Sequence, residues 1–180
     1  MKQALLIIDV QNDYFKNGKM ELVGPEQALE KIKQLEQYFS EKNLPIIYVQ
    51  HINPPQASFF QENTDGVLLH PELSAGSDSL IVTKHYPNSF LETNLDELLK
   101  AHKIEQLVIT GMMTHMCIDS GTRAAKELGY QPILIADATA TRDLSYAGKT
   151  TKAEDVQTAF LTALSTFANV QNTADFLANS

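Results

Sequence analysis

Five apolar runs of strand length divide this chain, and segments with helical periodicity lie between them. The runs are 4–10, 45–50, 80–84, 106–111 and 132–137. Because apolar residues fill these runs instead of alternating with polar ones, the runs predict strands that are buried on both faces. Strands that alternate with helices are typical of a parallel sheet, since parallel neighbours need crossover connections. The sequence therefore predicts a three-layer α/β/α fold around a parallel sheet.

Four amphipathic segments supply the predicted helices. The segment 25–43 begins with Pro25, a residue that is favoured in the first turn of a helix, and carries an apolar stripe at helical spacing. The stripe consists of Ala28, Ile32, Leu35 and Phe39. The other predicted helices are 91–101, 114–128 and 154–167. The longest segment without a clear period is 52–79, which contains Phe59 and Phe60; because loops of this length are usually functional or mobile, it is a candidate lid.

The length and charge of the chain limit its classes of function. With 180 residues it suits one α/β core, so we expect a single domain over residues 1–180. Fourteen basic and 22 acidic residues give a net charge of −8 without a basic cluster, which disfavours nucleic acid and anionic membranes as partners. The apolar run before Asp9 is too short for a secretory signal, and one cysteine forms no intrachain disulfide. We expect a cytoplasmic protein that acts on a small molecule.

An acid, a base and a thiol follow the predicted strands. Asp9 follows the apolar core of the first strand, Lys84 ends the third, and Cys117 lies shortly after the fourth. Taken singly, each residue has an ordinary structural explanation: a loop aspartate, a lysine whose stem lies on apolar surface, and a packed thiol. Open parallel sheets bind ligands at the carboxyl ends of their strands, where these three side chains are expected to meet. Together they favour catalysis, because an ammonium stabilises both neighbouring anions.

Cys117 is predicted to lie in the first turn of a helix. Thr114 stands three residues earlier, where its hydroxyl would accept a hydrogen bond from the Cys117 N–H and cap the helix. The positive end of the helix dipole would then lower the pKa of the thiol toward thiolate at neutral pH. This position favours a nucleophile over a packing residue.

Four stretches resemble the isochorismatase-like cysteine hydrolases, a family that includes nicotinamidases and carbamoylsarcosine-type amidohydrolases. They are LLIIDVQNDYF (5–15), TKHYPNSFLETNLDELL (83–99), LVITGMMTHMCIDSGTRAAKELGY (107–130) and ILIADATAT (133–141). The resemblance implies a Rossmann-like, six-stranded sheet in the order 3-2-1-4-5-6 and a homo-oligomer, a dimer or larger. That order puts Lys84 two strands from Asp9, about 10 Å at the usual strand spacing, so the lysine stem has to bridge the gap.

The resemblance also implies roles for individual residues. Asp9, Lys84 and Cys117 would form a catalytic triad, with Cys117 as the nucleophile on an amide-type carbonyl carbon. A cis peptide bond between Met112 and Met113 would aim the Met113 N–H, together with that of Cys117, at the oxyanion of the intermediate. The expected reaction is hydrolysis of a small C–N substrate through a thioester, with Asp9 taking and returning the proton.

Two features of this chain differ from those of particular members of the family. Nicotinamidases carry Asp-x-His and a further His after the second strand, which hold a metal; here the stretch VQHINPPQASFF has His51 but no Asp-x-His, so we expect no metal and no cofactor. True isochorismatases, which cleave a vinyl ether, lack the nucleophilic cysteine. The candidate pocket wall consists of Phe15, His51, Tyr86, Phe90, Met112 and His115. Its apolar, aromatic character favours a small neutral or weakly polar substrate.

Three other functions stay open at this stage. A vinyl-ether hydrolase of the isochorismatase type would use the same fold. A thiol redox sensor would need a reactive Cys117 and a resolving thiol from another molecule. A phosphorylated receiver domain would need an acidic cluster for magnesium after the first strand, where Asp9 is instead followed by Val10 and Gln11.

Overall fold

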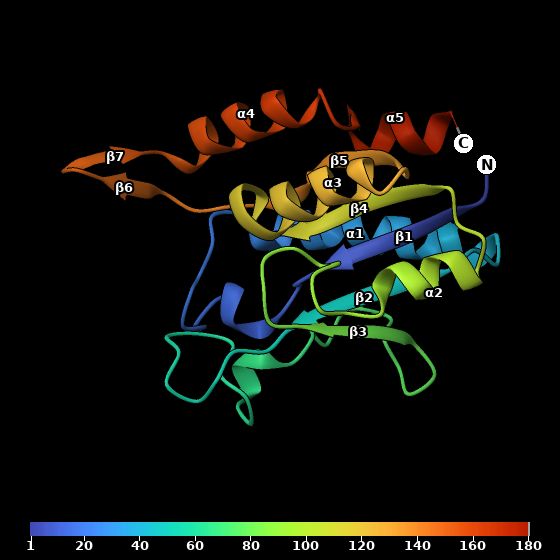
Figure 1. Ribbon diagram of the computed structural model, residues 1–180. Coiled ribbons are helices and arrows are strands. Elements are labelled where there is room, and N and C mark those ends of the chain that lie inside the picture. The colour runs from blue at the N-terminus through green and yellow to red at the C-terminus, as the bar shows by residue number, and fades with distance from the viewer. Residues whose placement is uncertain (180) are drawn as a thin grey trace.

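The computed structural model describes residues 1–179. Its centre is a six-stranded sheet in the order β3-β2-β1-β4-β5-β8 (Figure 1). The strands are β1 (Gln3–Ile8), β2 (Ile46–His51), β3 (Leu80–Lys84), β4 (Gln106–Met112), β5 (Gln131–Ala140) and β8 (Asn169–Gln171). Every pairing in this sheet is parallel, so all its strands end at the same edge.

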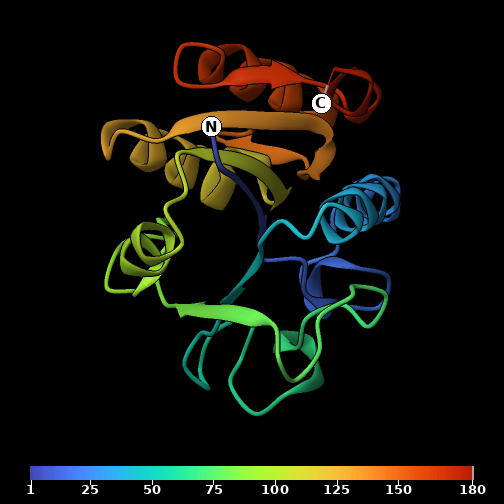
Figure 2. The ribbon, with the colours of Figure 1, turned by 90° about the vertical axis from the view of Figure 1, so that its right-hand side faces the viewer.

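Helices cover both faces of the sheet (Figure 2). The helices α1 (Pro25–Glu41) and α5 (Thr173–Ala178) lie on one face, and α2 (Leu95–Ala101), α3 (Asp119–Glu127) and α4 (Ala153–Leu164) lie on the other. Successive β1 residues enter different apolar clusters, Ile7 on the α1 face and Ile8 on the face of α2 and α3. Two buried faces explain why the runs of the inner strands are continuously apolar. The prediction is wrong for the edge strand β3, because Ile81 and Thr83 on one of its faces are exposed. Within residues 1–179, no helix is both long and apolar enough to cross a membrane.

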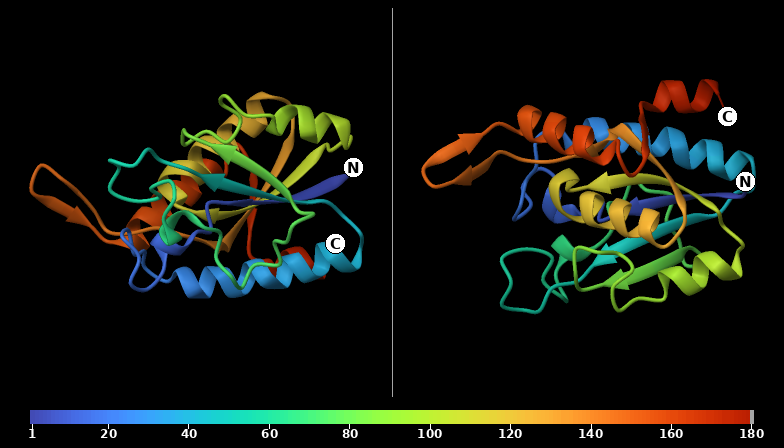
Figure 3. Two further views of the ribbon diagram at one scale, coloured as in Figure 1. Left: turned by 90° about the horizontal axis from the view of Figure 1, so that it is seen from below. Right: turned by 45° about the horizontal axis from the view of Figure 1, so that its top comes forward.

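The expected strand order is confirmed except for its last member. The sixth position belongs to β8, because two earlier strands, β6 (Leu144–Tyr146) and β7 (Lys149–Thr151), pair with each other as an antiparallel hairpin outside the sheet. This hairpin projects beyond the carboxyl ends of the sheet strands (Figure 3). Its tip is open to solvent, with Tyr146 88% exposed. The hairpin therefore adds an arm to the sheet edge at which the catalytic residues are expected.

The predicted helices form, but two of them begin differently. The helix predicted at 91–101 begins only at Leu95, because Glu92 has a φ of 54°, outside the helical region. The helix predicted at 114–128 begins as a π-helical turn, Thr114–Ile118, which leads into α3. The predicted cap is wrong: the Thr114 hydroxyl donates to the carbonyl of Ala140 at 3.2 Å, because Thr114 is buried against the end of β5.

The loop 52–79 is hydrogen-bonded through Phe60 to a short turn at the carboxyl edge of the sheet. Asp13, in the short 3-10 turn Asn12–Tyr14, accepts the N–H of Phe60 on Oδ2 at 2.6 Å and that of Lys19 on Oδ1 at 3.0 Å. Phe60 is fully buried, and its ring centroid lies 4.5 Å from that of Tyr14. Phe60 is therefore a core residue and cannot belong to a lid unless this packing opens.

Candidate active site

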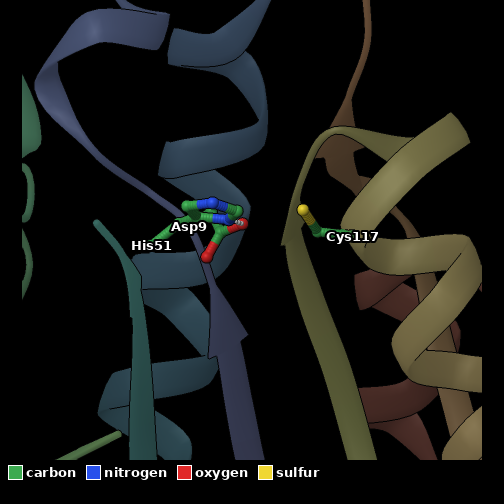
Figure 4. Close-up of side chains that lie close together, drawn as sticks. All are labelled: Asp9, His51 and Cys117. Atoms are coloured by element: carbon green, nitrogen blue, oxygen red, sulfur yellow. Dashed lines mark ion pairs between the residues drawn. The ribbon is translucent and has the colours of Figure 1, made fainter. Parts of the chain in front are cut away.

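The carboxyl edge of the sheet brings the three predicted catalytic residues together. Asp9 follows β1, Lys84 ends β3, and Cys117 lies in the π-helical turn between β4 and α3. Asp9 and Lys84 are completely buried, and Cys117 is 4% exposed. Figure 4 shows the Asp9 carboxylate and the Cys117 sulfur facing each other, with the ring of His51 beside the carboxylate. Three segments that are far apart in the sequence thus meet in one enclosed cluster.

The ammonium of Lys84 joins the members of this cluster. Its Nζ lies 2.8 Å from Oδ2 of Asp9 and 3.3 Å from Sγ of Cys117. It also lies 2.7 Å from Nδ1 of His51 and 3.1 Å from the backbone oxygen of Tyr86. The lysine stem therefore spans the two-strand gap between β3 and β1, and the expected meeting of the three groups is observed.

Two backbone features bring the ends of β1 and β4 into close contact. Asp9 has a φ of 53°, in the left-handed region, and its N–H still donates to the Val49 carbonyl at 3.0 Å. Gly111 has a φ of 118°, and a Cβ at this position would lie 2.0 Å from the carbonyl oxygen of Ile8. Only glycine permits this approach. The peptide bond between Met112 and Met113 is cis, as the resemblance implied.

Burial raises the pKa of the Cys117 thiol, and the negative charge of Asp9 raises this pKa further, while the Lys84 ammonium acts in the opposite direction. Because the net pKa lies above the ordinary value of cysteine, the resting thiol is protonated at neutral pH. The prediction of a resting thiolate is therefore wrong. Cys117 is enclosed in a turn ahead of α3, where the loss of solvation outweighs the favourable charges.

Lys84 is positively charged in the resting site. Burial acts to lower its pKa, but the charge of Asp9 and the hydrogen bonds to Asp9 and Cys117 act in the opposite direction, and the net pKa is raised. Because the sulfur of Cys117 keeps its proton, the carboxylate of Asp9 is the anion that balances the ammonium. The resting cluster therefore consists of one carboxylate, one ammonium and one thiol.

His51 is held at the site by two residues that the sequence pattern did not identify. The side chain of Gln11 accepts the His51 N–H at 2.8 Å and donates to the His51 carbonyl at 2.8 Å. Oδ1 of Asn53 lies 2.9 Å from Nε2 of His51. Burial lowers the pKa of His51, and the charge of Lys84 lowers this pKa further, so the imidazole is neutral at pH 7. Gln11 and Asn53 lie just after β1 and β2, and this position is the one signal that could have drawn attention to them.

Two of the predicted pocket residues reach the site region through polar contacts. The backbone carbonyl of Tyr86 accepts a hydrogen bond from Lys84, while its side chain is 41% exposed. His115, two residues before Cys117, has its Nδ1 2.6 Å from the hydroxyl of Thr141. A role for either side chain in substrate binding stays a prediction.

The other predicted pocket residues pack in apolar clusters. Met112 is fully buried in the cluster on the α1 face, where Phe15 also lies with its ring centroid 4.1 Å from that of His70. Phe90 packs against the cluster on the opposite face, which includes Cys117, and its ring centroid lies 6.1 Å from that of Tyr130. Their part in a substrate pocket stays a prediction.

A cation and a phenol that the sequence pattern did not identify also lie near the site. Burial raises the pKa of Tyr14, and the negative charge of Asp9 raises this pKa further, while the charge of Arg142 acts to lower it. Burial lowers the pKa of His115, and the charge of Arg142 lowers it further. Nε of Arg142 is buried without a hydrogen-bond partner, and within residues 1–179 no carboxylate forms an ion pair with this guanidinium. Arg142 therefore presents an uncompensated positive charge in this region.

Asp9, His51 and Cys117 also offer one metal-ligand atom each, all within 4.8 Å of one another. Carboxylate, imidazole and thiolate are ligands that zinc accepts. However, the same Asp9, His51 and Cys117 side chains surround the ammonium of Lys84 at 2.8, 2.7 and 3.3 Å. The position that a metal ion would need is therefore taken by a cation of the chain itself, and a metal fits this cluster poorly.

Sequence and structure comparisons relate nearly the whole chain to one group of proteins. The isochorismatase domain profile matches residues 3–175. The chain is 42% identical over 179 residues to the uncharacterized isochorismatase family protein YddQ of Bacillus subtilis, covering 98% of this chain and 99% of YddQ. It is 30% identical over 145 residues to a streptothricin hydrolase of Streptomyces noursei, covering 81% of this chain and 52% of that protein. A solved structure of an isochorismatase-hydrolase relative from Oleispira antarctica superimposes with a TM-score of 0.95 at 43% identity, covering 98% of this chain and 96% of that chain.

Proposed function

We propose that this chain, which belongs to the isochorismatase family of hydrolases, hydrolyses a small amide-type substrate with Cys117 as its nucleophile. The observation that carries this proposal is the contact of one buried ammonium, that of Lys84, with both Asp9 and Cys117. A thiol, a base and a fixed cation within hydrogen-bond reach are the parts that covalent catalysis needs.

Asp9 is the base of the first half-reaction. As the sulfur of Cys117 attacks the carbonyl carbon, the thiol proton passes to the carboxylate of Asp9 and a C–S bond forms. Lys84 keeps its charge and stabilises the negative charge that develops on the sulfur. The C–N bond then breaks, and the leaving nitrogen takes the proton from Asp9. An amine departs, and a thioester remains on Cys117.

Asp9 also serves the second half-reaction. A water molecule gives a proton to the carboxylate and its oxygen attacks the thioester carbon. The C–S bond breaks, the sulfur recovers the proton, and the acid leaves. One amide and one water are converted to one acid and one amine, and the cluster returns to its resting protonation state.

The N–H groups of Met113 and Cys117 are the proposed donors to the oxyanion. Met113 precedes the π-helical turn and Cys117 lies within it, and the N–H groups of Met116 and Ile118 both donate to the Met113 carbonyl, at 3.0 and 3.3 Å. These bonds fix the turn relative to Met113, and a fixed donor aimed at the developing charge contributes about 3–4 kcal/mol to the transition state.

Arg142 bears on the class of substrate. The apolar residues near the site favour a neutral amide, whereas an unpaired guanidinium favours an amide that also carries a carboxylate, because Arg binds carboxylates in a bidentate manner. The name of the streptothricin hydrolase relative supports hydrolysis as the reaction class and does not choose between these substrates.

A panel of matched amides tests the proposed function. Neutral primary amides and N-carbamoyl compounds are each paired with an analogue that carries a carboxylate, and intact mass is measured after quenching during turnover. The expected result is an acyl adduct on the wild-type chain, acid and amine as products, and no adduct on Cys117→Ala. Cleavage of a vinyl ether without an adduct, or a sulfenic adduct with peroxide and no amide turnover, would contradict the proposal.

A further inference from the structure

The Lys84 ammonium has more acceptors than protons. An ammonium carries three N–H groups, and four acceptor atoms lie within 3.3 Å of Nζ. Nδ1 of His51 is the nearest of them at 2.7 Å, slightly closer than the carboxylate of Asp9 at 2.8 Å. The contact with Cys117, at 3.3 Å, is the longest. The position of the charge beside the sulfur therefore depends on how the other acceptors hold the ammonium.

Hydrogen bonds outside the cluster decide which nitrogen of His51 can accept. The amide nitrogen of Asn53 donates to the backbone oxygen of Phe59 at 3.0 Å, which turns Oδ1 of Asn53 toward the imidazole. Oδ1 lies 2.9 Å from Nε2 and can only accept, so Nε2 carries the proton. Nδ1 is then left with its lone pair, which faces Lys84.

The backbone of His51 is fixed as well. Gln11 bonds to both the N–H and the carbonyl of His51, each at 2.8 Å. His51 is also the register partner of Lys84 across the parallel pair β2 and β3. Only 8% of His51 is exposed. The ring therefore has a defined position and a defined proton. Its lone pair faces the Lys84 ammonium at 2.7 Å, and the Asp9 carboxylate lies farther from the same nitrogen, at 3.9 Å.

We infer that His51 is a positioning residue for Lys84, a neutral acceptor that holds the ammonium beside Cys117 without cancelling its charge. A second carboxylate in this place would hold the ammonium equally well but would neutralise it, and the sulfur would lose its stabilising cation. Without His51, Asp9 becomes the strongest acceptor, and the ammonium shifts toward it and away from the sulfur. The expected effect of His51 on turnover rests on the proposed function, whereas its expected effect on the reactivity of the Cys117 thiol does not.

Two substitutions separate the acceptor from the rest of the ring. Asn carries Oδ1 at the same number of bonds from Cα as Nδ1 of histidine, so His51→Asn keeps an acceptor for Lys84, whereas His51→Leu removes it. On an accepted amide we expect His51→Leu to lower kcat about 10- to 100-fold with KM within about twofold, the loss typical of a hydrogen bond to a charged group. We expect His51→Asn to stay within about fivefold of the wild-type kcat. His102→Leu, at the end of α2, is the matched control and should be unaffected.

Two readouts need no substrate. Alkylation of Cys117 by iodoacetamide should slow about tenfold in His51→Leu and stay near the wild-type rate in His51→Asn. In the 15N-labelled wild-type chain, long-range imidazole spectra should show Nε2 protonated and Nδ1 unprotonated at neutral pH. This measurement decides the tautomer even if His51→Leu fails to fold.

The outcomes separate this inference from the proposed function. If no amide is turned over by the wild type, the proposed function fails, and the alkylation rates and the tautomer still test His51. The positioning role would be overturned if His51→Leu kept the wild-type kcat and alkylation rate. It would also be overturned if His51→Asn and His51→Leu lost these rates equally, or if the spectra showed the proton on Nδ1.

Discussion

Cys117 is protonated at rest because the enclosed cluster offers little solvation to an anion. The same enclosure strengthens the attraction between the Lys84 ammonium and any charge that develops on the sulfur. The thiol is therefore weakly nucleophilic in the free protein and becomes a nucleophile as its proton moves to Asp9. In this cluster, reactivity depends on the arrival of a carbonyl carbon to attack.

The raised pKa of Cys117 predicts how its alkylation depends on pH. Because only the thiolate reacts, the rate constant with iodoacetamide should keep rising with pH beyond about 10.5, where an ordinary cysteine of pKa about 8.5 has already levelled off. The same chain in denaturant provides the control and should level off at the ordinary value. A plateau below pH 8 in the native protein would show that the thiolate is already favoured at rest.

Substitution of the nucleophile predicts a complete loss of turnover. Cys117→Ala should lower kcat/KM on any accepted amide at least about 10³-fold, because the covalent route is removed. Thermal unfolding should change little, since one sulfur atom is removed and the Lys84 ammonium keeps its contacts with Asp9, His51 and Tyr86. Retention of more than a trace of activity in Cys117→Ala would end the proposed mechanism.

The sequence identified some site residues and could not identify others, for a physical reason. Asp9, Lys84 and Cys117 stand out because chemically active side chains rarely follow buried strands by chance. The contact of His51 with Lys84 depends on the register between β2 and β3, which no single-strand pattern contains. The raised pKa of Cys117 depends on its enclosure, which also appears only in three dimensions.

At the scale of elements, long apolar runs were predictable and short strands were not. Four of the five predicted strands are buried on both faces and the edge strand β3 is buried on one, and each leaves an apolar run in the sequence. The strands β6, β7 and β8 have three residues each and are half-buried or exposed, so they leave no such run. The start of α3 was misjudged for a related reason, because a π-helical turn has no apolar period of its own.

The attachment of the loop 52–79 predicts an effect of Asp13 on local stability. In Asp13→Ala the N–H groups of Phe60 and Lys19 lose their acceptor, and the buried N–H of Phe60 should cost about 1–3 kcal/mol. Limited proteolysis within 52–79 should be faster in Asp13→Ala than in the wild type, by more than the change in global stability accounts for. Asp65→Ala, an exposed aspartate of the same loop, is the control and should be cut at the wild-type rate. Equal rates for both variants would contradict the anchoring role.

At the scale of the whole molecule, one buried acid ties together a helix, a strand and a loop. Glu36 of α1 is 2% exposed and accepts the Tyr48 hydroxyl of β2 at 2.6 Å and the Ser74 N–H of the loop before β3 at 3.0 Å. Burial raises its pKa above its ordinary value of 4.5, although these hydrogen bonds act to lower it. Folding thus brings a carboxylate into a place where its charge is disfavoured.

This linkage predicts a pH-dependent loss of global stability that Glu36→Gln should remove. The folded state binds the Glu36 proton more tightly than the unfolded state, so the free energy of unfolding falls as pH rises from about 4.5 through the folded pKa and is then constant. In urea unfolding at several pH values, the stability of Glu36→Gln relative to wild type should therefore rise across this window and level off above it. Glu30→Gln, an exposed residue of the same helix, should show no such rise. If the difference in the free energy of unfolding between Glu36→Gln and wild type stayed constant with pH, the Glu36 carboxyl would have the same pKa in the folded and unfolded states. Burial would then not control its charge.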